Sequence, residues 1–204
     1  MKDAKAHLSK DPILKKLIAK HQIKEYWGGH DNYFLDLIEI ITGQQLSMKA
    51  AKSIFTRFLN LYSGSPREAG GEVGPNPQQV VNTSAEKLRA IGFSTSKANY
   101  VQNIAKATTS GALLLDQLEK MTDEEIKNEL TKIKGIGPWS AEMFLIFSLK
   151  RPDVFSVGDL GLRTAIEKLY SINRDDLKAI LTLSQTWSPH RTLAARLLWA
   201  SLDN

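Results

Sequence analysis

The stretch from Leu130 to Ala141, L-T-K-I-K-G-I-G-P-W-S-A, constrains the fold more than any other part of the chain. Residues 124–132 favour a helix, but the two glycines that follow would each cost about 1 kcal/mol in a helix interior, so the chain must turn there. Pro138 suits the first position of a new helix, and the apolar run after it continues to Leu149. The sequence therefore predicts a helix, a tight hairpin and a second helix.

This hairpin predicts a contact with an anion. Gly135 and Gly137 would let the backbone approach a ligand closely, and the N–H groups at the start of the second helix attract a phosphate. The alternative is an ordinary helical hairpin whose glycines only make the turn. The G-x-G spacing alone does not separate these two interpretations.

The composition predicts a globular helical protein with few options for a cofactor. The chain has 204 residues, 42% of them hydrophobic, which is enough for one sizeable core or two small lobes. It contains no cysteine, which excludes disulfides, thiolate zinc sites and cysteine-held iron–sulfur clusters. No apolar run approaches the ~20 residues of a membrane span, the first residues lack the apolar core of a signal peptide, and no stretch alternates as a strand does. An intracellular, all-helical protein is expected.

The charge distribution predicts an anionic partner that is held by local contacts. The net charge is +5, yet residues 1–24, with seven lysines and two aspartates, account for all of it. The remaining residues are neutral overall, so bulk electrostatics cannot hold an anion on the body of the protein. The lysines near the N-terminus form either a solvated helix face or a set of phosphate contacts.

Local signals predict where the helices begin. Asp11-Pro12 opens one helix and Ser47 another, while Thr83-x-x-Glu86 and Thr122-x-x-Glu125 are capping-box patterns. Ser63 to Pro77 contains four glycines and three prolines, which predicts a long surface loop. Further helices are expected over residues 33–42, 94–108, 160–170, 175–183 and 191–202.

Five strings, taken together and in this order, resemble the helix-hairpin-helix DNA glycosylase superfamily, and within it the alkylpurine (3-methyladenine) DNA glycosylase II branch. They are G-Q-Q-L-S at 43–47, G-F-S at 92–94, I-K-G-I-G-P-W-S-A at 133–141, D-V-F-S-V-G-D-L-G-L-R at 153–163 and W-S-P-H-R at 187–191. The resemblance implies an all-α fold in which two helical lobes flank a DNA-binding cleft. One lobe would comprise about residues 45–148, and the other residues 1–44 with 149–204.

The resemblance also implies that Asp159 is catalytic. A fixed carboxylate there would stabilise the positive charge that develops on the deoxyribose C1′ and would orient a water. Asp159 is equally suited to cap the helix that follows, and Val157-Gly158 precede it where relatives often have proline. Trp139 stands where bifunctional relatives carry a lysine nucleophile. An indole cannot form a Schiff base, so the enzyme would be monofunctional.

Two further sets of residues follow from the resemblance. The pocket for the flipped base would contain Trp139, Met143, His190 and Gln44, although a Met or a His at such positions can equally be packing. An aromatic face would favour a cationic alkylated purine by about 0.5–2 kcal/mol. The DNA contacts would come from the hairpin and from the loop that enters the duplex, which supply Lys134, Gly135, Ile136, Gly137 and Ser140, and Gln45, Leu46 and Ser47.

The expected partner is double-stranded DNA containing damaged bases, bound by a monomer in the compartment that holds the DNA. No cofactor is implied, but relatives hold an alkali-metal ion on hairpin carbonyls that correspond here to Thr131, Ile133 and Gly135. The alternatives are a non-catalytic helix-hairpin-helix DNA-binding module and a glycosylase for another damaged base. Asp159 argues against a pure binding module because its charge would repel phosphates, and Trp139 argues against a bifunctional oxidised-purine enzyme.

Overall fold

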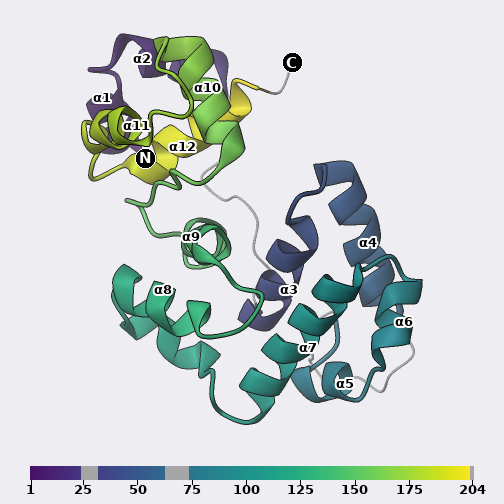
Figure 1. Cartoon of the computed structure of the whole chain (residues 1–204). Helices are drawn as coiled ribbons and strands as arrows, with labels where there is room; N and C mark the ends of the chain where they lie inside the picture. Colours follow the sequence, from purple (N-terminus) through teal and green to yellow (C-terminus); the bar gives the residue numbers. More distant parts are fainter. Residues whose placement is uncertain (24–31, 63–73, 203–204) are drawn as a thin grey trace. The chain divides into compact units, whose positions relative to one another are not determined.

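The computed structural model describes residues 1–23, 32–62 and 74–202, and within these ranges its regular elements are all helices (Figure 1). This confirms the expected fold class. None of the described helices is long and apolar enough to cross a membrane. In chain order the helices are α1 (Lys2–Leu8), α2 (Pro12–Lys20), α3 (Tyr33–Gly43), α4 (Met48–Asn60), α5 (Pro77–Val81), α6 (Ala85–Ala90), α7 (Thr95–Thr109), the 3-10 helix η1 (Leu115–Lys120), α8 (Asp123–Thr131), α9 (Pro138–Phe147), α10 (Leu160–Tyr170), α11 (Leu177–Gln185) and α12 (Arg191–Ala200).

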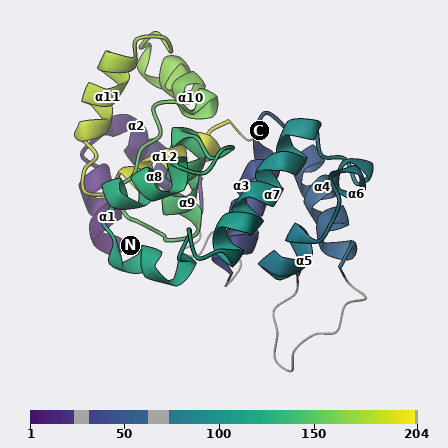
Figure 2. The same ribbon diagram turned by 60° about the horizontal axis from the view of Figure 1, so that its bottom comes forward.

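The chain divides into two compact units, which we call the hairpin unit (residues 29–144) and the terminal unit (residues 1–28 and 145–204). In the hairpin unit α3 packs against α4 and α7 (Figures 1 and 2). Residues up to 44 were predicted to belong with the C-terminal helices, but the structure places the boundary between the two units before α3. The apolar side chains of α3, among them Phe34, Ile38 and Ile41, are buried in the core, so α3 belongs with the hairpin.

Side-chain caps begin α2, α4, α8 and α10 where the sequence predicted them. Ser47 caps α4, and Thr122 with Glu125 forms the predicted capping box at α8. The prediction for Thr83 was wrong by one residue: Ser84 caps α6, because the Thr83 hydroxyl bonds to the Gln79 carbonyl instead. The helices α1 and α5 were not predicted from the sequence. Residues 63–73 of the expected surface loop lie outside the described part of the chain.

In the terminal unit, Asp11 links three segments of the chain. Its Oδ1 accepts the N–H groups of Ile13 and Leu14 at 2.8 and 3.0 Å, which caps α2 as predicted. Its Oδ2 accepts the Tyr170 hydroxyl at 2.9 Å and the Trp187 indole N–H at 3.1 Å. Burial raises the pKa of Tyr170, and the hydrogen bond to Asp11 and its charge raise it further. Around this carboxylate lies a core to which α1, α2, α10, α11 and α12 all contribute.

Candidate nucleic-acid interface and active site

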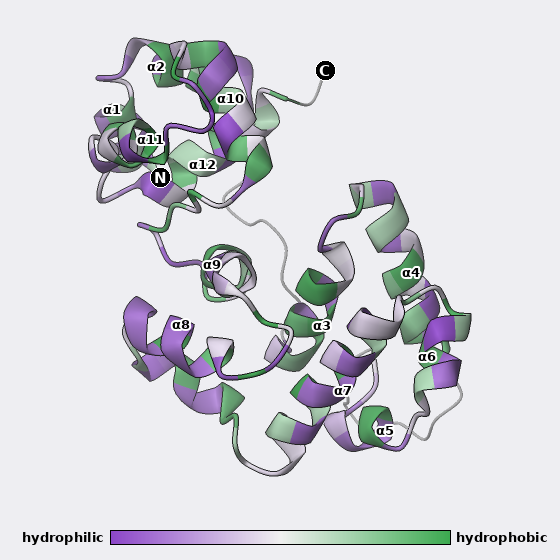
Figure 3. Ribbon diagram, viewed as in Figure 1, coloured by the Kyte–Doolittle hydropathy of each residue, from purple (hydrophilic) through white to green (hydrophobic). Residues whose placement is uncertain are grey.

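The helix-hairpin-helix predicted from the sequence is present. The mostly hydrophilic α8 ends at Thr131, and α9 begins at Pro138 (Figure 3). Between them, the Ile133 N–H donates to the Leu130 carbonyl at 3.1 Å and the Ile136 N–H donates to the Ile133 carbonyl at 3.0 Å. The turn is therefore closed by short-range backbone bonds.

The two glycines of the hairpin have different roles. Gly135 has φ +116°, and a Cβ built there would lie 2.3, 2.5 and 2.7 Å from Cγ, Cβ and Cδ1 of Tyr100. A side chain is therefore excluded at Gly135 by both conformation and packing. A Cβ at Gly137 would meet nothing within 4 Å. The open space that a phosphate would need is thus at Gly137.

Two other hairpin residues that were expected to contact DNA have buried side chains, and their contact with DNA stays a prediction. Ser140 is only 1% exposed, and its Oγ accepts a hydrogen bond from Gln44 Nε2 at 2.9 Å, so its side chain serves the interior. Ile136 is 4% exposed and its N–H is used inside the turn, so it anchors the hairpin to the core. Lys134 is exposed and available for a phosphate, while its carbonyl accepts a hydrogen bond from Asn103 Nδ2 at 3.0 Å.

The loop between α3 and α4 presents apolar side chains beside a left-handed residue. Gln45 has φ +56°, which is uncommon for a residue other than glycine. Leu46 is 41% exposed, and Met48, at the first position of α4, is 79% exposed. Ser47 uses its hydroxyl to accept the Ala50 N–H at 3.3 Å. Met48 was not singled out from the sequence, because its spacing to Ala51 and Phe55 matches the apolar stripe of α4; only the structure shows that it is exposed.

Lys97 is a second residue that the sequence analysis missed. It is half-buried on α7, and its Nζ donates to the carbonyls of Thr42 and Gln44 at 2.8 and 2.6 Å. These carbonyls lie at the C-terminal end of α3, where a cation is favoured by the helix dipole. Burial lowers the pKa of Lys97. A lone lysine carries no sequence signal for such a role, because its acceptors lie more than fifty residues away.

Asp159 caps α10, as the sequence predicted, and is held by an indole as well. Its Oδ1 accepts the Leu162 N–H at 2.8 Å and the Trp199 indole N–H at 2.9 Å. A Cβ at Gly161 would lie 3.1 Å from this oxygen and 3.2 Å from Trp199, so a glycine keeps the pair uncrowded. The Phe147 ring stacks on Trp199 with centroids 5.7 Å apart. Trp199 was not identified from the sequence, because it is forty residues from Asp159.

The loop before α12 is fixed by a carboxylate. Asp153 accepts two hydrogen bonds from the Arg191 guanidinium, at 2.8 and 2.9 Å, and one from the Ser188 hydroxyl at 2.8 Å. Burial acts to raise the pKa of Asp153, but these hydrogen bonds outweigh it and hold the pKa below its usual value. His190 lies in this loop with its ring 5.5 Å from that of His7, and it lines a cavity of about 350 Å³ in the terminal unit.

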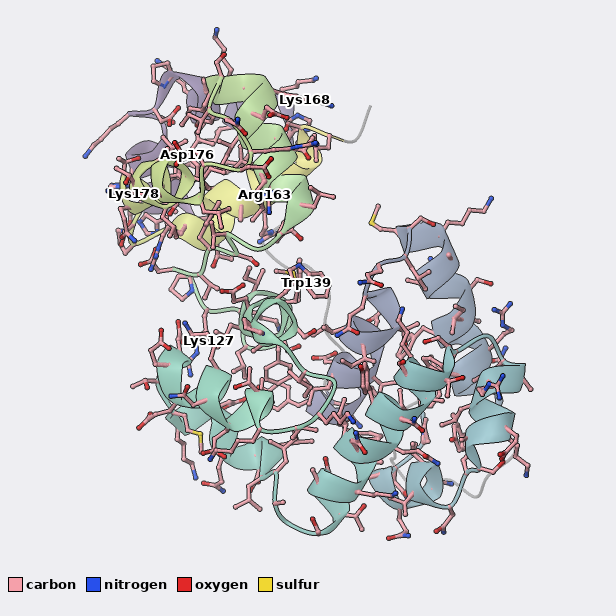
Figure 4. The ribbon with its side chains drawn as sticks, viewed as in Figure 1. Lys127, Trp139, Arg163, Lys168, Asp176 and Lys178 are labelled. Carbon is pink, nitrogen blue, oxygen red and sulfur yellow. The ribbon has the colours of Figure 1, made fainter. Side chains whose placement is uncertain are left out.

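The residues expected to line the base pocket are divided between the two units. Trp139, half-buried on α9 (Figure 4), and Met143, 4% exposed, belong with Gln44 to the hairpin unit. The fourth, His190, belongs to the terminal unit, as does the catalytic candidate Asp159. The Gln44 amide nitrogen donates to the carbonyl of Gly135 and to Ser140, which ties its loop to the hairpin. Contact of these four side chains with a base stays a prediction.

The ion expected on the hairpin carbonyls also stays a prediction. Two of its three ligands accept hydrogen bonds: the Ile133 carbonyl from Ile136, and the Gly135 carbonyl from Gln44 at 3.0 Å. A carbonyl oxygen has a second lone pair, so these bonds are compatible with an ion without requiring one. Within residues 1–23, 32–62 and 74–202, no group of three or more His, Asp or Glu side chains could hold a metal ion.

The fold and the hairpin together define a protein of the helix-hairpin-helix class, which binds DNA. The chain belongs to the HhH-GPD superfamily of base excision DNA repair proteins, whose family model matches residues 38–189. This match confirms the superfamily that the sequence motifs resemble.

Three known proteins illustrate the relationship. The DNA-3-methyladenine glycosylase 1 of Schizosaccharomyces pombe is 38% identical over 166 residues, covering 80% of this chain and 70% of the relative. A putative DNA-3-methyladenine glycosylase of Bacillus subtilis is 32% identical, over 82% of this chain and 58% of the relative. A solved structure of the S. pombe 3-methyladenine DNA glycosylase Mag1 in complex with abasic DNA is similar with a TM-score of 0.86 at 33% identity, covering 99% of this chain and 97% of that one.

Proposed function

We propose that this protein is a monofunctional DNA glycosylase of base excision repair that removes alkylated purines of the 3-methyladenine and 7-methylguanine type. The observation that carries the proposal is the orientation of Asp159, whose Oδ1 is fixed by two N–H donors, from Leu162 and Trp199. The names of the relatives supply the substrate class, because both are 3-methyladenine glycosylases or putative ones.

Hydrolysis of an N-glycosidic bond requires a carboxylate that is held in a fixed position. Breaking an N-glycosidic bond builds positive charge on C1′, and a fixed anion nearby stabilises that charge without reorganising during the reaction. The same group can orient or deprotonate the attacking water. Two N–H donors on one carboxylate oxygen hold Asp159 for this role, and the two roles of cap and catalyst are compatible.

Trp139 supports hydrolysis without strand cleavage. A bifunctional enzyme needs an amine that attacks C1′ and forms a Schiff base, and an indole cannot do so. An indole face would instead favour a cationic purine over a neutral one. The positive charge of an alkylated purine also makes it a good leaving group, so the protein has less catalysis to supply.

For DNA binding, the structural features that support the proposal are Gly137 and Lys134. Gly137 leaves open space at the start of α9, and Lys134 is exposed beside it. A phosphate at this place would meet the N-terminal end of a helix and one cation. The neutral net charge of residues 25–204 makes such local contacts necessary.

The test is to incubate the protein with methylated double-stranded DNA, to identify the released bases by chromatography, and to ask whether the strand is cut without heat or base. Release of alkylated purines from an uncut strand is expected. Asp159→Asn should lose nearly all excision while it keeps its affinity for DNA with an abasic-site analogue. Asparagine is a good helix cap, so this change removes the charge and spares the fold.

Asp176 offers a matched control, because it caps α11 in the same unit (Figure 4) and accepts the Ala179 N–H at 3.0 Å. Asp176→Asn should leave excision unchanged. Excision by Asp159→Asn within a few-fold of wild type would remove this carboxylate from the mechanism. DNA binding without any base release by the wild type would favour the non-catalytic binding module instead.

A further inference from the structure

One face of α7 holds both of the loops that are expected to meet DNA. Lys97, Tyr100 and Asn103 are spaced three residues apart and so lie along one side of the helix. Lys97 Nζ holds two carbonyls at the end of α3, Tyr100 packs beneath Gly135, and Asn103 Nδ2 holds the Lys134 carbonyl. The α3–α4 loop and the hairpin therefore share one support.

Gln44 joins the two loops directly. Its backbone carbonyl accepts Lys97 Nζ at 2.6 Å, while its side-chain nitrogen donates to the Gly135 carbonyl at 3.0 Å and to Ser140 Oγ at 2.9 Å. The partners of this one amide are 91 and 96 residues away in the chain. Lys97 thus fixes the main chain from which the Gln44 side chain reaches the hairpin.

The residue after Gln44 shows why such a support is needed. Gln45 is held at φ +56°, a conformation that costs a non-glycine residue energy and persists only where the surrounding structure over-determines it. The backbone conformation of Gln45 sets the direction of the chain that carries the exposed side chains of Leu46 and Met48. If Gln44 were released, Gln45 could relax and the exposed side chains would lose their fixed direction.

We infer that Lys97, Asn103 and Gln44 are positioning residues that couple the α3–α4 loop to the hairpin, so that both engage one DNA duplex in a fixed register. The inference rests on the proposed function for its consequence in catalysis. Its physical basis is the set of hydrogen bonds above, all of which lie within the hairpin unit.

Hydrogen–deuterium exchange of the free protein tests the coupling without any activity. Lys97→Met keeps the side-chain stem and removes the ammonium, whose hydrogen bonds go to the carbonyls of Thr42 and Gln44 and not to the hairpin. The variant should nonetheless speed exchange in peptides covering residues 133–137, by about threefold or more, as well as in residues 43–47. The reciprocal variant, Asn103→Ala, should speed exchange in residues 43–47. Lys106→Met is the matched control, because Lys106 is exposed on the opposite side of α7, nine residues on.

Excision assays test the positioning role. A glycosylase must unstack its target, and this costs least when the damaged base is already mispaired. Lys97→Met and Asn103→Ala should lose about tenfold in excision from a fully paired duplex and much less from a duplex with the lesion in a mismatch. Lys97→Arg, which keeps the charge, should recover much of the loss.

Each outcome decides a separate point. The coupling would be overturned if Lys97→Met speeds exchange only in residues 43–47 and Asn103→Ala only in residues 133–137. This holds even if both variants are less active. Equal losses on paired and mispaired DNA, or no loss at all, would overturn the positioning role and leave only a contribution to stability. Absence of excision by the wild type would overturn the proposed function and with it the positioning role, whereas the exchange result would still decide the coupling.

Discussion

Adding one methyl group at each hairpin glycine should give opposite results, and the difference can be worked out from the structure. At Gly135, an alanine would have to adopt φ +116°, which costs about 1–3 kcal/mol. Its methyl would also lie 2.3–2.7 Å from Tyr100. One of the atoms it meets is the Tyr100 Cβ, which cannot move without α7, so overpacking adds about 1–3 kcal/mol. Gly135→Ala should therefore lose about 2–6 kcal/mol of stability.

At Gly137 the same methyl group meets nothing within 4 Å. Alanine is a poorer residue than glycine just before a helix, but the cost is at most about 1 kcal/mol. Gly137→Ala should therefore fold normally. If a phosphate sits against Gly137, the methyl group occupies its place, so binding to DNA with an abasic-site analogue should weaken while the fold remains.

Thermal unfolding followed by circular dichroism, and binding titrations at matched salt, measure the two effects. For a chain of this size we expect Gly135→Ala to lower the Tm by roughly 4–24 °C, and Gly137→Ala by less than about 4 °C. Equal Tm values for the two variants would refute the packing of Tyr100 against Gly135. Wild-type affinity and salt dependence in a folded Gly137→Ala would refute the assignment of the phosphate to this hairpin.

Three further changes probe the terminal unit and one probes the reaction type. Asp11→Asn should lose about 2–4 kcal/mol in urea unfolding, because an amide NH₂ facing the phenol and indole donors leaves them without an acceptor. Trp199→Phe keeps an aromatic ring, although a smaller one, and removes the N–H that orients Asp159, so kcat should fall about tenfold with little change in KM. An unchanged kcat would refute that orientation. Folding lowers the pKa of Asp153, so the carboxylate stabilises the fold at pH values above its unfolded pKa, and this stabilisation is lost as the pH falls through the folded pKa. The Tm of Asp153→Asn should therefore fall less on acidification than the Tm of the wild type. Trp139→Lys should not create lyase activity, since a productive lysine must also be desolvated and aimed at C1′. Borohydride trapping of a covalent DNA adduct, with the wild type or with the variant, would contradict a monofunctional reaction.

Local interactions are what the sequence by itself determined. The hairpin between residues 131 and 138 follows from two glycines and a proline, and the caps at Ser47, Thr122 and Asp159 each bond within three residues of their own position. Such features need no knowledge of the rest of the chain, because their donors and acceptors are neighbours in sequence. The family could be predicted for the same reason, since its motifs are short strings.

Only the tertiary structure decided the long-range partners. The placement of α3 beside α7, the bonds of Gln44 to the hairpin and the hold of Trp199 on Asp159 join residues 40 or more positions apart. A polar side chain in the sequence indicates that it needs a partner, but not which one. Ser140 illustrates the difference: its place in the hairpin motif predicts a DNA contact, but only the fold shows that its buried hydroxyl accepts a hydrogen bond from Gln44. Burial is set by how the helices pack, and that is a property of the whole fold.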